Sequence, residues 1–204
     1  MNIAKLYAKD LLIEFENLSL PINPKKIAEA KGIIIKEDDL EGFSGMLLKV
    51  GKRTLISVKR SIRERGKKRF TLAHELGHYL LTKHLTPSDI SFECTDEDIH
   101  HFGEKDNKES DVNAFAAELL MPEEFFRERI RLSDLTYELI DSLTKDFDTT
   151  LTATGRRFVE LSSSYALVCS QNSKIKWFLK GEDFPYYLYS SGTVSESSVA
   201  IDFY

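Results

Sequence analysis

The sequence predicts an α+β fold, mainly helical, with a small antiparallel sheet and a short helical and β-hairpin part at the carboxyl end. Apolar residues recur at helical spacing over residues 3–18, 67–83 and 109–120, which predicts helices there. The β-branched run at residues 33–35 is too short for a helix and predicts a strand. No internal repeat or low-complexity segment interrupts this pattern.

Prolines and glycines mark the ends of the elements in the first half of the chain. Pro21 and Pro24 end the first helix, and a second helix over residues 25–31 has Pro24 in its first turn and Gly32 at its carboxyl end. Strands over residues 46–50 and 54–58 flank a turn, which indicates a hairpin. The polar, acidic stretch from residue 86 to 108 is assigned neither helix nor strand.

The second half predicts helices first and strands last. The helix over residues 109–120 ends at Met121-Pro122, because proline cannot donate the next helical hydrogen bond. Shorter helices follow over residues 123–131, 134–145 and 150–162, and strands over 165–169 and 175–179. We therefore divide the chain into a first domain over residues 1–125, a helical segment over 126–162 and a strand-rich appendage over 163–204.

The composition is that of a folded globular protein. Of the 204 residues, 42% are hydrophobic and 30% charged, which excludes wholesale disorder, and a net charge of −5 argues against a polyanion binder. Cys94 and Cys169 form neither a disulfide framework nor a metal-binding pair. We find no signal-peptide core and no apolar stretch long enough to span a membrane, so we expect a cytoplasmic protein.

The segment RFTLAHELGHYLL, residues 69–81, contains the motif HExxH on a strongly helical pattern. Residues four apart on an α-helix differ by about 40° around its axis, so His74 and His78 point to the same side. Two imidazoles one turn apart can bind one zinc ion, and Glu75 can then reach the water that the metal holds. The alternative, two structural histidines around an accidental glutamate, does not explain this helical placement.

HExxH supplies two metal ligands, so a third has to come from elsewhere. His84 has the spacing of the third histidine in HExxHxxGxxH proteases, where a glycine turns the chain back towards the metal. Here Leu81 takes the place of that glycine and continues the helix, which leaves His84 about 120° away from His78. We therefore exclude His84.

The helix over residues 109–120 offers the third ligand instead. Glu109, Asn113 and Ala116 lie within about 40° of one another on a helical wheel. Glu109 can supply a carboxylate oxygen, Asn113 can hydrogen-bond a ligand histidine, and Ala116 allows close helix packing. Asp111 and Glu118 lie on the opposite face and are expected to be solvated. The predicted ligands are His74, His78 and Glu109.

Two blocks of this sequence resemble the ImmA/IrrE-type bacterial metallopeptidases. They are RFTLAHELGH at residues 69–78 and ExxxNAFAAELLMP at residues 109–122, within a similarity that extends over about residues 21–161. The resemblance implies one Zn²⁺ ion, or Mn²⁺ as an alternative, on His74, His78 and Glu109, with Glu75 as general base. Members of this family cleave a helix-turn-helix repressor and so switch on mobile-element or stress genes, which implies such a repressor as the protein partner.

Several features remain open at this stage. A donor that stabilises the oxyanion is expected, with His100, His101, Tyr137 and Arg156 as candidates among which the sequence does not choose. Cys94 with His100 or His101 lacks a fourth ligand for a second metal site. The aromatic-rich carboxyl end is either a hairpin packed on the core or a docking appendage.

Two features bear on other functions. Residues 59–69 hold seven basic residues and one acidic residue. This run has three alternative interpretations: a nucleic-acid patch, a solvated face, or a surface that steers an acidic peptide to the cleft. The helices over 134–145 and 150–162 have helix-turn-helix dimensions, but their acidic residues would repel phosphates, so specific nucleic-acid binding is not expected. A catalytically silent, zinc-stabilised module or DNA-associated regulator that sequesters its repressor is the alternative function, although Glu75 would serve no purpose there.

Overall fold

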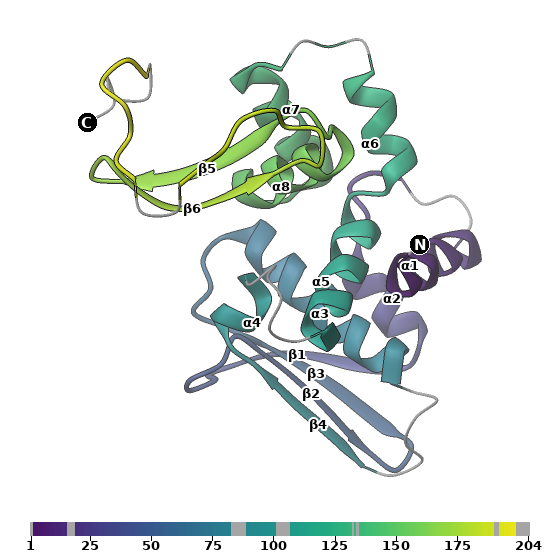
Figure 1. Cartoon of the computed structure of the whole chain (residues 1–204). Helices are drawn as coiled ribbons and strands as arrows, with labels where there is room; N and C mark the ends of the chain where they lie inside the picture. Colours follow the sequence, from purple (N-terminus) through teal and green to yellow (C-terminus); the bar gives the residue numbers. More distant parts are fainter. Residues whose placement is uncertain are drawn as a thin grey trace. The chain divides into compact units, whose positions relative to one another are not determined.

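A computed structural model describes residues 2–15, 19–82, 89–100, 107–131, 133, 135–189 and 192–198 (Figure 1). The chain forms two compact units, Met1–Leu151 and Thr152–Tyr204. The α+β class predicted from the sequence is confirmed, with helices as the dominant element. The sequence suggested helix-turn-helix dimensions for one pair of helices. The boundary after Leu151 places the first helix of that pair in the first unit and nearly all of the second helix in the second unit.

The first unit contains a four-stranded sheet with the strand order β1-β3-β2-β4. β2 (Gly45–Val50) and β3 (Arg53–Lys59) form the predicted hairpin, and β4 (Ile90–Cys94) pairs antiparallel with β2. β1 (Ile33–Asp38) runs parallel to β3, so the sheet is mixed and not antiparallel as the sequence predicted. The physical reason is the position of β3 between β1 and β2. The hairpin turn makes β3 antiparallel to β2, and in this position β3 runs in the same direction as β1.

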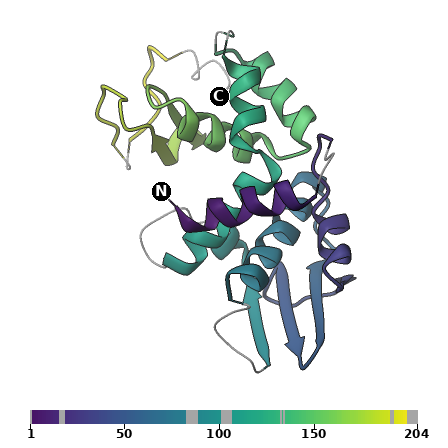
Figure 2. The same cartoon turned by 90° about the vertical axis from the view of Figure 1, so that its right-hand side faces the viewer.

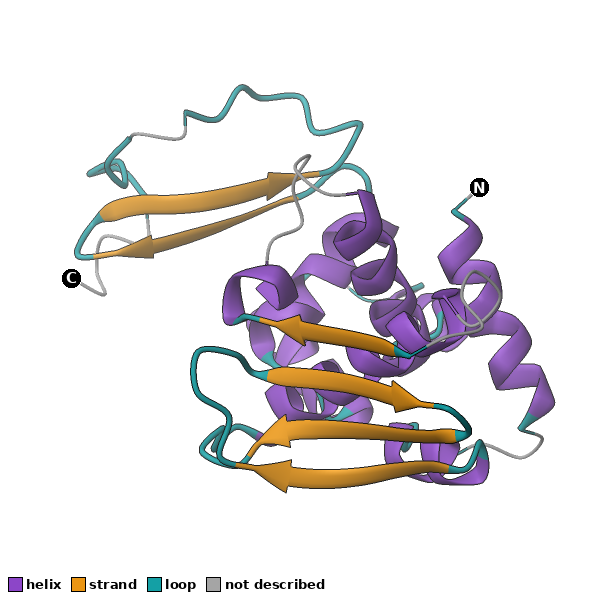
Figure 3. Cartoon of the chain, turned by 90° about the horizontal axis from the view of Figure 1, so that it is seen from below, coloured by secondary structure: helices purple, strands orange, loops and turns teal. Residues whose placement is uncertain are grey.

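Helices α1 (Ile3–Glu14), α2 (Pro24–Ala30), α3 (Arg65–Thr82) and α5 (Asn107–Leu120) cover one face of this sheet (Figures 1 and 3). α3 packs on β2 and β3, while α5 packs between α3 and α1 (Figure 2). A Cβ atom on Gly77 of α3 would lie 2.9 Å from the Phe115 ring and 3.0 Å from Val112, both on α5. The helix axes therefore approach closely at the centre of the HExxH motif.

The helix boundaries follow the sequence prediction closely, except at the end of α1 and at the start of α7 (Tyr137–Phe147), which begins three residues later than the predicted residue 134. α3 and α5 begin two residues earlier than predicted, whereas α1 ends at Glu14, before the predicted end at residue 18, and residues 16–18 lie outside the described part. α6 (Glu123–Ile130) and α7 follow α5, as predicted. None of the helices in the described ranges is long and apolar enough to cross a membrane.

The acidic stretch over residues 86–108 contains two elements that the sequence analysis did not assign. β4 forms the sheet edge next to β2, and α4 (Asp96–His100) follows it directly. β4 has the alternation of a strand, but it is five residues long and lies among acidic residues, so its local signal is weak. Its pairing with β2 joins Cys94 to Gly45, 49 residues earlier, and is a long-range contact that no local pattern reveals.

The beginning of α3 is held by the end of α7. The Arg69 guanidinium donates hydrogen bonds to the backbone oxygens of Asp148 at 2.9 Å and Phe147 at 3.4 Å, and to that of Ile22. A Cβ atom on Gly66 would lie 2.5 Å from the Thr149 backbone carbon. These contacts fix the position of the helix that carries the HExxH motif.

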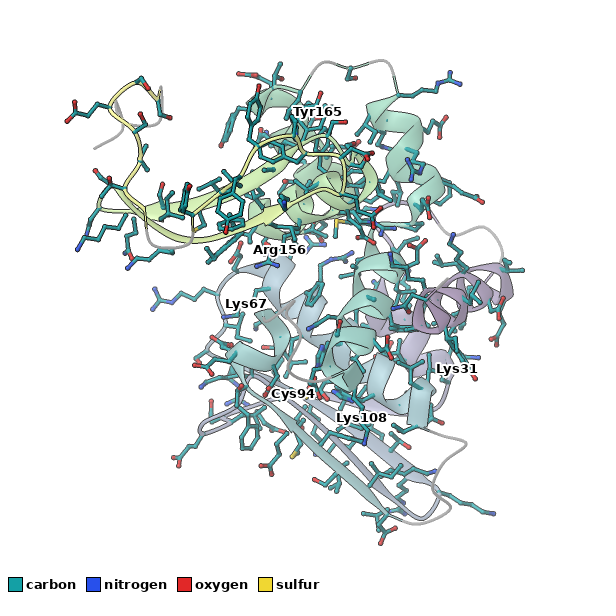
Figure 4. The ribbon with its side chains drawn as sticks, in the orientation of Figure 1. Lys31, Lys67, Cys94, Lys108, Arg156 and Tyr165 are labelled. Atoms are coloured by element: carbon teal, nitrogen blue, oxygen red, sulfur yellow. The ribbon has the colours of Figure 1, made fainter. Side chains whose placement is uncertain are left out.

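The second unit consists of α8 (Leu151–Leu161) and a hairpin of β5 (Ala166–Gln171) and β6 (Lys174–Lys180), which the sequence predicted. The turn residues Asn172 and Ser173 both have positive φ, which matches the twist of the flanking strands. α8 packs on the hairpin, where the Arg156 guanidinium lies 4.4 Å from the centre of the Trp177 ring (Figure 4).

Candidate metal centre

The HExxH helix places two buried imidazoles side by side. His74 and His78 are one turn apart on α3 and are 0% and 2% exposed. Their Nε2 atoms lie 3.1 Å apart. Two imidazole nitrogen atoms at this distance, one helical turn apart, are placed to hold the same cation.

Glu109 of α5 points its carboxylate at both imidazoles. Its Oε2 atom lies 3.1 Å from His74 Nε2 and 3.3 Å from His78 Nε2, and it is buried without a hydrogen bond of good geometry. Burial would raise the pKa of Glu109, but the two adjacent imidazoles outweigh that effect and lower it to about 2. Glu109 is therefore an ionised oxygen donor directed at the two ring nitrogens.

Asn113, one turn after Glu109, orients the His74 ring. Its side-chain nitrogen donates a 2.9 Å hydrogen bond to the Asp98 backbone oxygen, so its Oδ1 atom faces His74 Nδ1, also at 2.9 Å. This network assigns the ring proton of His74 to Nδ1. The lone pair of Nε2 is then directed at His78 and Glu109, as a metal ligand requires.

Cys94, at the end of β4 and labelled in Figure 4, is a fourth donor at this cluster. Its Sγ atom lies 3.3 Å from His78 Nε2, and the donor atoms of His74, His78, Cys94 and Glu109 all lie within 4.8 Å of one another. Burial, followed by the charge of Glu75, raises the pKa of the free thiol. The sequence analysis weighed Cys94 only with His100 and His101, and His101 and the His100 side chain lie outside the described residues.

Alternation along β4 places Cys94 on the same face of the strand as Phe92, although only the pairing with β2 brings that face to the metal centre. Phe92 and Cys94 are two residues apart on a strand and so share a face. The Phe92 ring stacks on the His78 ring at 4.5 Å between centroids with an interplanar angle of 15°. This face of β4 therefore forms one wall of the metal centre.

Glu75 lies beside the cluster, and its carboxylate occupies space that a side chain at position 45 would otherwise fill. It is 0% exposed, and neither carboxylate oxygen has a hydrogen-bond partner among the described N and O atoms. A Cβ atom on Gly45 of β2 would lie 2.2 Å from Glu75 Oε1. Burial raises the pKa of Glu75 to about 7, against the opposing effects of His74 and the Cys94 thiol. A bound dication would lower it by charge attraction.

One expectation about α5 is wrong. Glu118 is not solvated but 1% exposed, and its Oε1 atom accepts a 3.1 Å hydrogen bond from the Glu123 backbone N–H at the start of α6. The chain turns at Pro122, so the first backbone N–H of α6 meets the Glu118 carboxylate, which caps that helix. Asp111 is exposed, as expected, and Ala116 is fully buried.

The other candidates are distributed as follows. His84 lies outside the described residues. Tyr137 is 67% exposed on α7, and Arg156 stacks on Trp177 within the second unit. The structure therefore does not select an oxyanion donor from the candidates.

A cavity of about 570 Å³ opens next to the metal centre. It is lined by Ser44, which precedes Gly45, and by Asp96, which follows Cys94 by two residues. Lys59, Arg63 and Lys67 contribute positive charge to its walls, and Glu64 adds negative charge beside Asp96.

Most of the basic run at residues 59–69 is neutralised within the chain. Ion pairs join Arg60 to Asp39, Lys68 to Glu37 and Lys67 to Asp96, with N···O distances of 2.9, 2.6 and 2.7 Å. Arg65 and Arg69 pair with Asp148 at 2.8 and 3.3 Å. The run is therefore not a free array of cations.

Two histidines one turn apart, a carboxylate from a second helix and a buried glutamate beside them define a domain of the metallopeptidase type. Residues 28–159 match the family model Peptidase M78, the IrrE N-terminal-like domain, and the chain belongs to this family. The resemblance to the ImmA/IrrE family inferred from the sequence is thereby confirmed. A comparison with curated proteins gave no match.

Proposed function

We propose that this protein is a zinc-dependent endopeptidase that acts in the cytoplasm on a helix-turn-helix repressor, relieving repression of mobile-element or stress genes. His74, His78 and Glu109 are the proposed metal ligands, Glu75 the general base and Asn113 the residue that orients His74. The observation that carries the proposal is the convergence of two imidazoles and a carboxylate beside the buried carboxylate of Glu75, whose oxygens have no hydrogen-bond partner among the described N and O atoms.

The donor set fits zinc. Two histidines and one glutamate are a ligand set that catalytic zinc sites use. In a tetrahedral site with metal–nitrogen distances of about 2.0–2.1 Å, neighbouring ligand atoms lie about 3.3 Å apart. Here the distances among His74 Nε2, His78 Nε2 and Glu109 Oε2 are 3.1, 3.1 and 3.3 Å. A zinc ion, when bound, supplies Lewis acidity for the scissile carbonyl and acidifies water.

The chain's own residues account for the proton movements of peptide hydrolysis. Glu75 accepts the proton of the attacking water and delivers it to the leaving amine, as a general base and then a general acid. Its buried oxygens have no competing hydrogen bond among the described N and O atoms, and Gly45 leaves the space in which they lie. Asn113 keeps the proton of His74 on Nδ1, away from the reacting groups.

The surroundings of the site support a peptide substrate. Lys59 and Arg63 line the neighbouring cavity outside the Lys67–Asp96 ion pair and outnumber the remaining acid, Glu64, which favours a segment that carries acidic side chains. The internal ion pairs of the basic run weaken the case for a nucleic-acid patch.

A second candidate function is a catalytically silent, metal-stabilised module, or a DNA-associated regulator, that sequesters the repressor. The observation in its favour is Cys94, because four protein donors can close a zinc site. Glu75 argues against it, since a closed structural site has no use for a buried carboxylate that costs free energy to desolvate.

The test uses the metal-loaded protein and the helix-turn-helix protein encoded beside it, incubated together and analysed by mass spectrometry. Glu75→Gln is expected to lower the cleavage rate by about 10²–10⁴-fold with metal content unchanged, because an amide cannot accept the proton. Glu93→Gln, an exposed position on β4, is the matched control and should cleave normally. Cleavage by Glu75→Gln at the wild-type rate would remove the proposed general base, and a stable complex without a cut would favour sequestration.

A further inference from the structure

We infer that the sulfur of Cys94 is a fourth protein ligand of the metal in the substrate-free protein, and that it leaves the metal when the reaction begins. The inference rests on the metal site of the proposed function, but not on the identity of the substrate. It assigns to β4 a role in regulating access to the metal.

The sheet holds the Cys94 side chain in place. Gly45 and Cys94 are register partners of β2 and β4, and the Ser44 backbone N–H donates a 2.8 Å hydrogen bond to the Cys94 backbone oxygen. Phe92, on the same face of β4, stacks on the His78 ring. Backbone pairing and ring stacking therefore fix the sulfur relative to His78.

The distances suit coordination. Metal–nitrogen and metal–sulfur distances of about 2.0–2.1 Å and 2.3 Å in a tetrahedral zinc site place nitrogen and sulfur about 3.6 Å apart. The Cys94 Sγ atom lies 3.3 Å from His78 Nε2, and it lies within 4.8 Å of the donor atoms of His74 and Glu109. No large rearrangement is needed for all four donors to bind one ion.

The alternative is that Cys94 is a small apolar residue of the core, as many buried cysteines are. The surroundings argue against this reading, because the sulfur lies 3.3 Å from a ring nitrogen and within 4.8 Å of the Glu109 donor oxygen, and the charge of the buried Glu75 carboxylate acts on the thiol. An apolar side chain would gain little from such neighbours, whereas a metal ligand would complete the set.

Four protein ligands fill a tetrahedral site, so substrate and water gain access only when one ligand leaves. Cys94 is the one of the four that lies on the sheet and outside the two motif helices. Its departure breaks one metal–sulfur bond, and the thiolate takes up one proton from the solvent that enters the site. When the sulfur binds the metal again, the metal–sulfur bond forms and the thiol proton returns to solvent.

Cobalt(II) provides the test, because a cobalt–thiolate bond gives a charge-transfer absorption in the near ultraviolet that histidine and carboxylate ligands do not give. The protein is loaded with cobalt(II), and its absorption is compared with that of Cys94→Ala and Cys94→Ser. Cys169→Ser, which removes the other cysteine, is the matched control. We expect the band in the wild type and in Cys169→Ser, and its loss in both Cys94 variants, which keep the visible cobalt bands.

A second readout is metal affinity by chelator competition, with folding of each variant checked by circular dichroism. Loss of Cys94 should lower zinc affinity by about 10²-fold, which is close to the contribution of one ligand when the binding free energy of a four-ligand site is divided equally among its ligands. Bound cobalt(II) without the charge-transfer band in the wild type, or a band that persists in Cys94→Ala, would overturn the inference. Unchanged cobalt binding in His78→Ala would instead refute the metal site, and a Cys94-dependent band without repressor cleavage would leave the inference standing while the peptidase proposal fails.

Discussion

Replacement of Glu109 by alanine removes a carboxylate that contacts both imidazoles, at 3.1 and 3.3 Å. A structural zinc site with four protein ligands has an apparent binding free energy of about 10–16 kcal/mol, so an equal share per ligand is about 3 kcal/mol. That share corresponds to a loss of zinc affinity of about 10²-fold. Because the Glu109 side chain is 22% exposed, water can enter after its removal and offset part of the loss.

The assay is competition with a chromophoric chelator at fixed pH. Asp111→Ala is the matched control, since Asp111 lies two residues further on the same helix and is exposed to solvent. Glu118, which the sequence placed on the solvated face, is unsuitable because it is buried and caps α6. Glu109→Gln keeps the shape of the side chain with a weaker oxygen donor and should fall between the wild type and the alanine variant. Equal affinities of Glu109→Ala and Asp111→Ala would refute the assignment of Glu109 as a ligand.

Three further substitutions test the surroundings of the metal centre. Gly45→Ala should reduce cleavage at least tenfold at unchanged zinc content, because its Cβ would lie 2.2 Å from Glu75 Oε1; a wild-type cleavage rate would show that Glu75 can move without cost. Asn113→Ala should weaken zinc binding by about 10–100-fold in the chelator assay, since the His74 ring loses the acceptor that orients it. Gly66→Ala should destabilise the first unit by about 1–3 kcal/mol in urea denaturation, because the Thr149 backbone, 2.5 Å from the added atom, cannot give way; an unchanged midpoint would contradict this packing.

The sequence by itself determined the parts of this protein that depend on one helix at a time. The spacing of His74 and His78 places them on one side of α3, and that of Glu109 and Asn113 places them on one side of α5. The helical period is local, so these relations hold before any tertiary contact forms. The α+β class and most helix boundaries could be predicted for the same reason.

The sequence predicted the wrong environment for Glu118 and an antiparallel sheet in place of a mixed one. Both errors concern contacts between elements. Glu118 is buried and bonded to the first backbone N–H of α6, and β3, the central neighbour of β1 and β2, is antiparallel to β2 and parallel to β1. A helical wheel or a run of β-branched residues contains no information about which neighbour will cover a given face.

Only the tertiary structure brought Cys94, Phe92 and Gly45 to the metal centre. The first two lie on β4, a five-residue strand in an acidic stretch, and its register with β2 sets Cys94 opposite Gly45. Strand register is decided by partners distant in sequence, whose pairing is selected by burial of one face of the sheet. The motif helices therefore determined where the metal ligands of this protein point, and the folding of the sheet against them decided what else faces the metal.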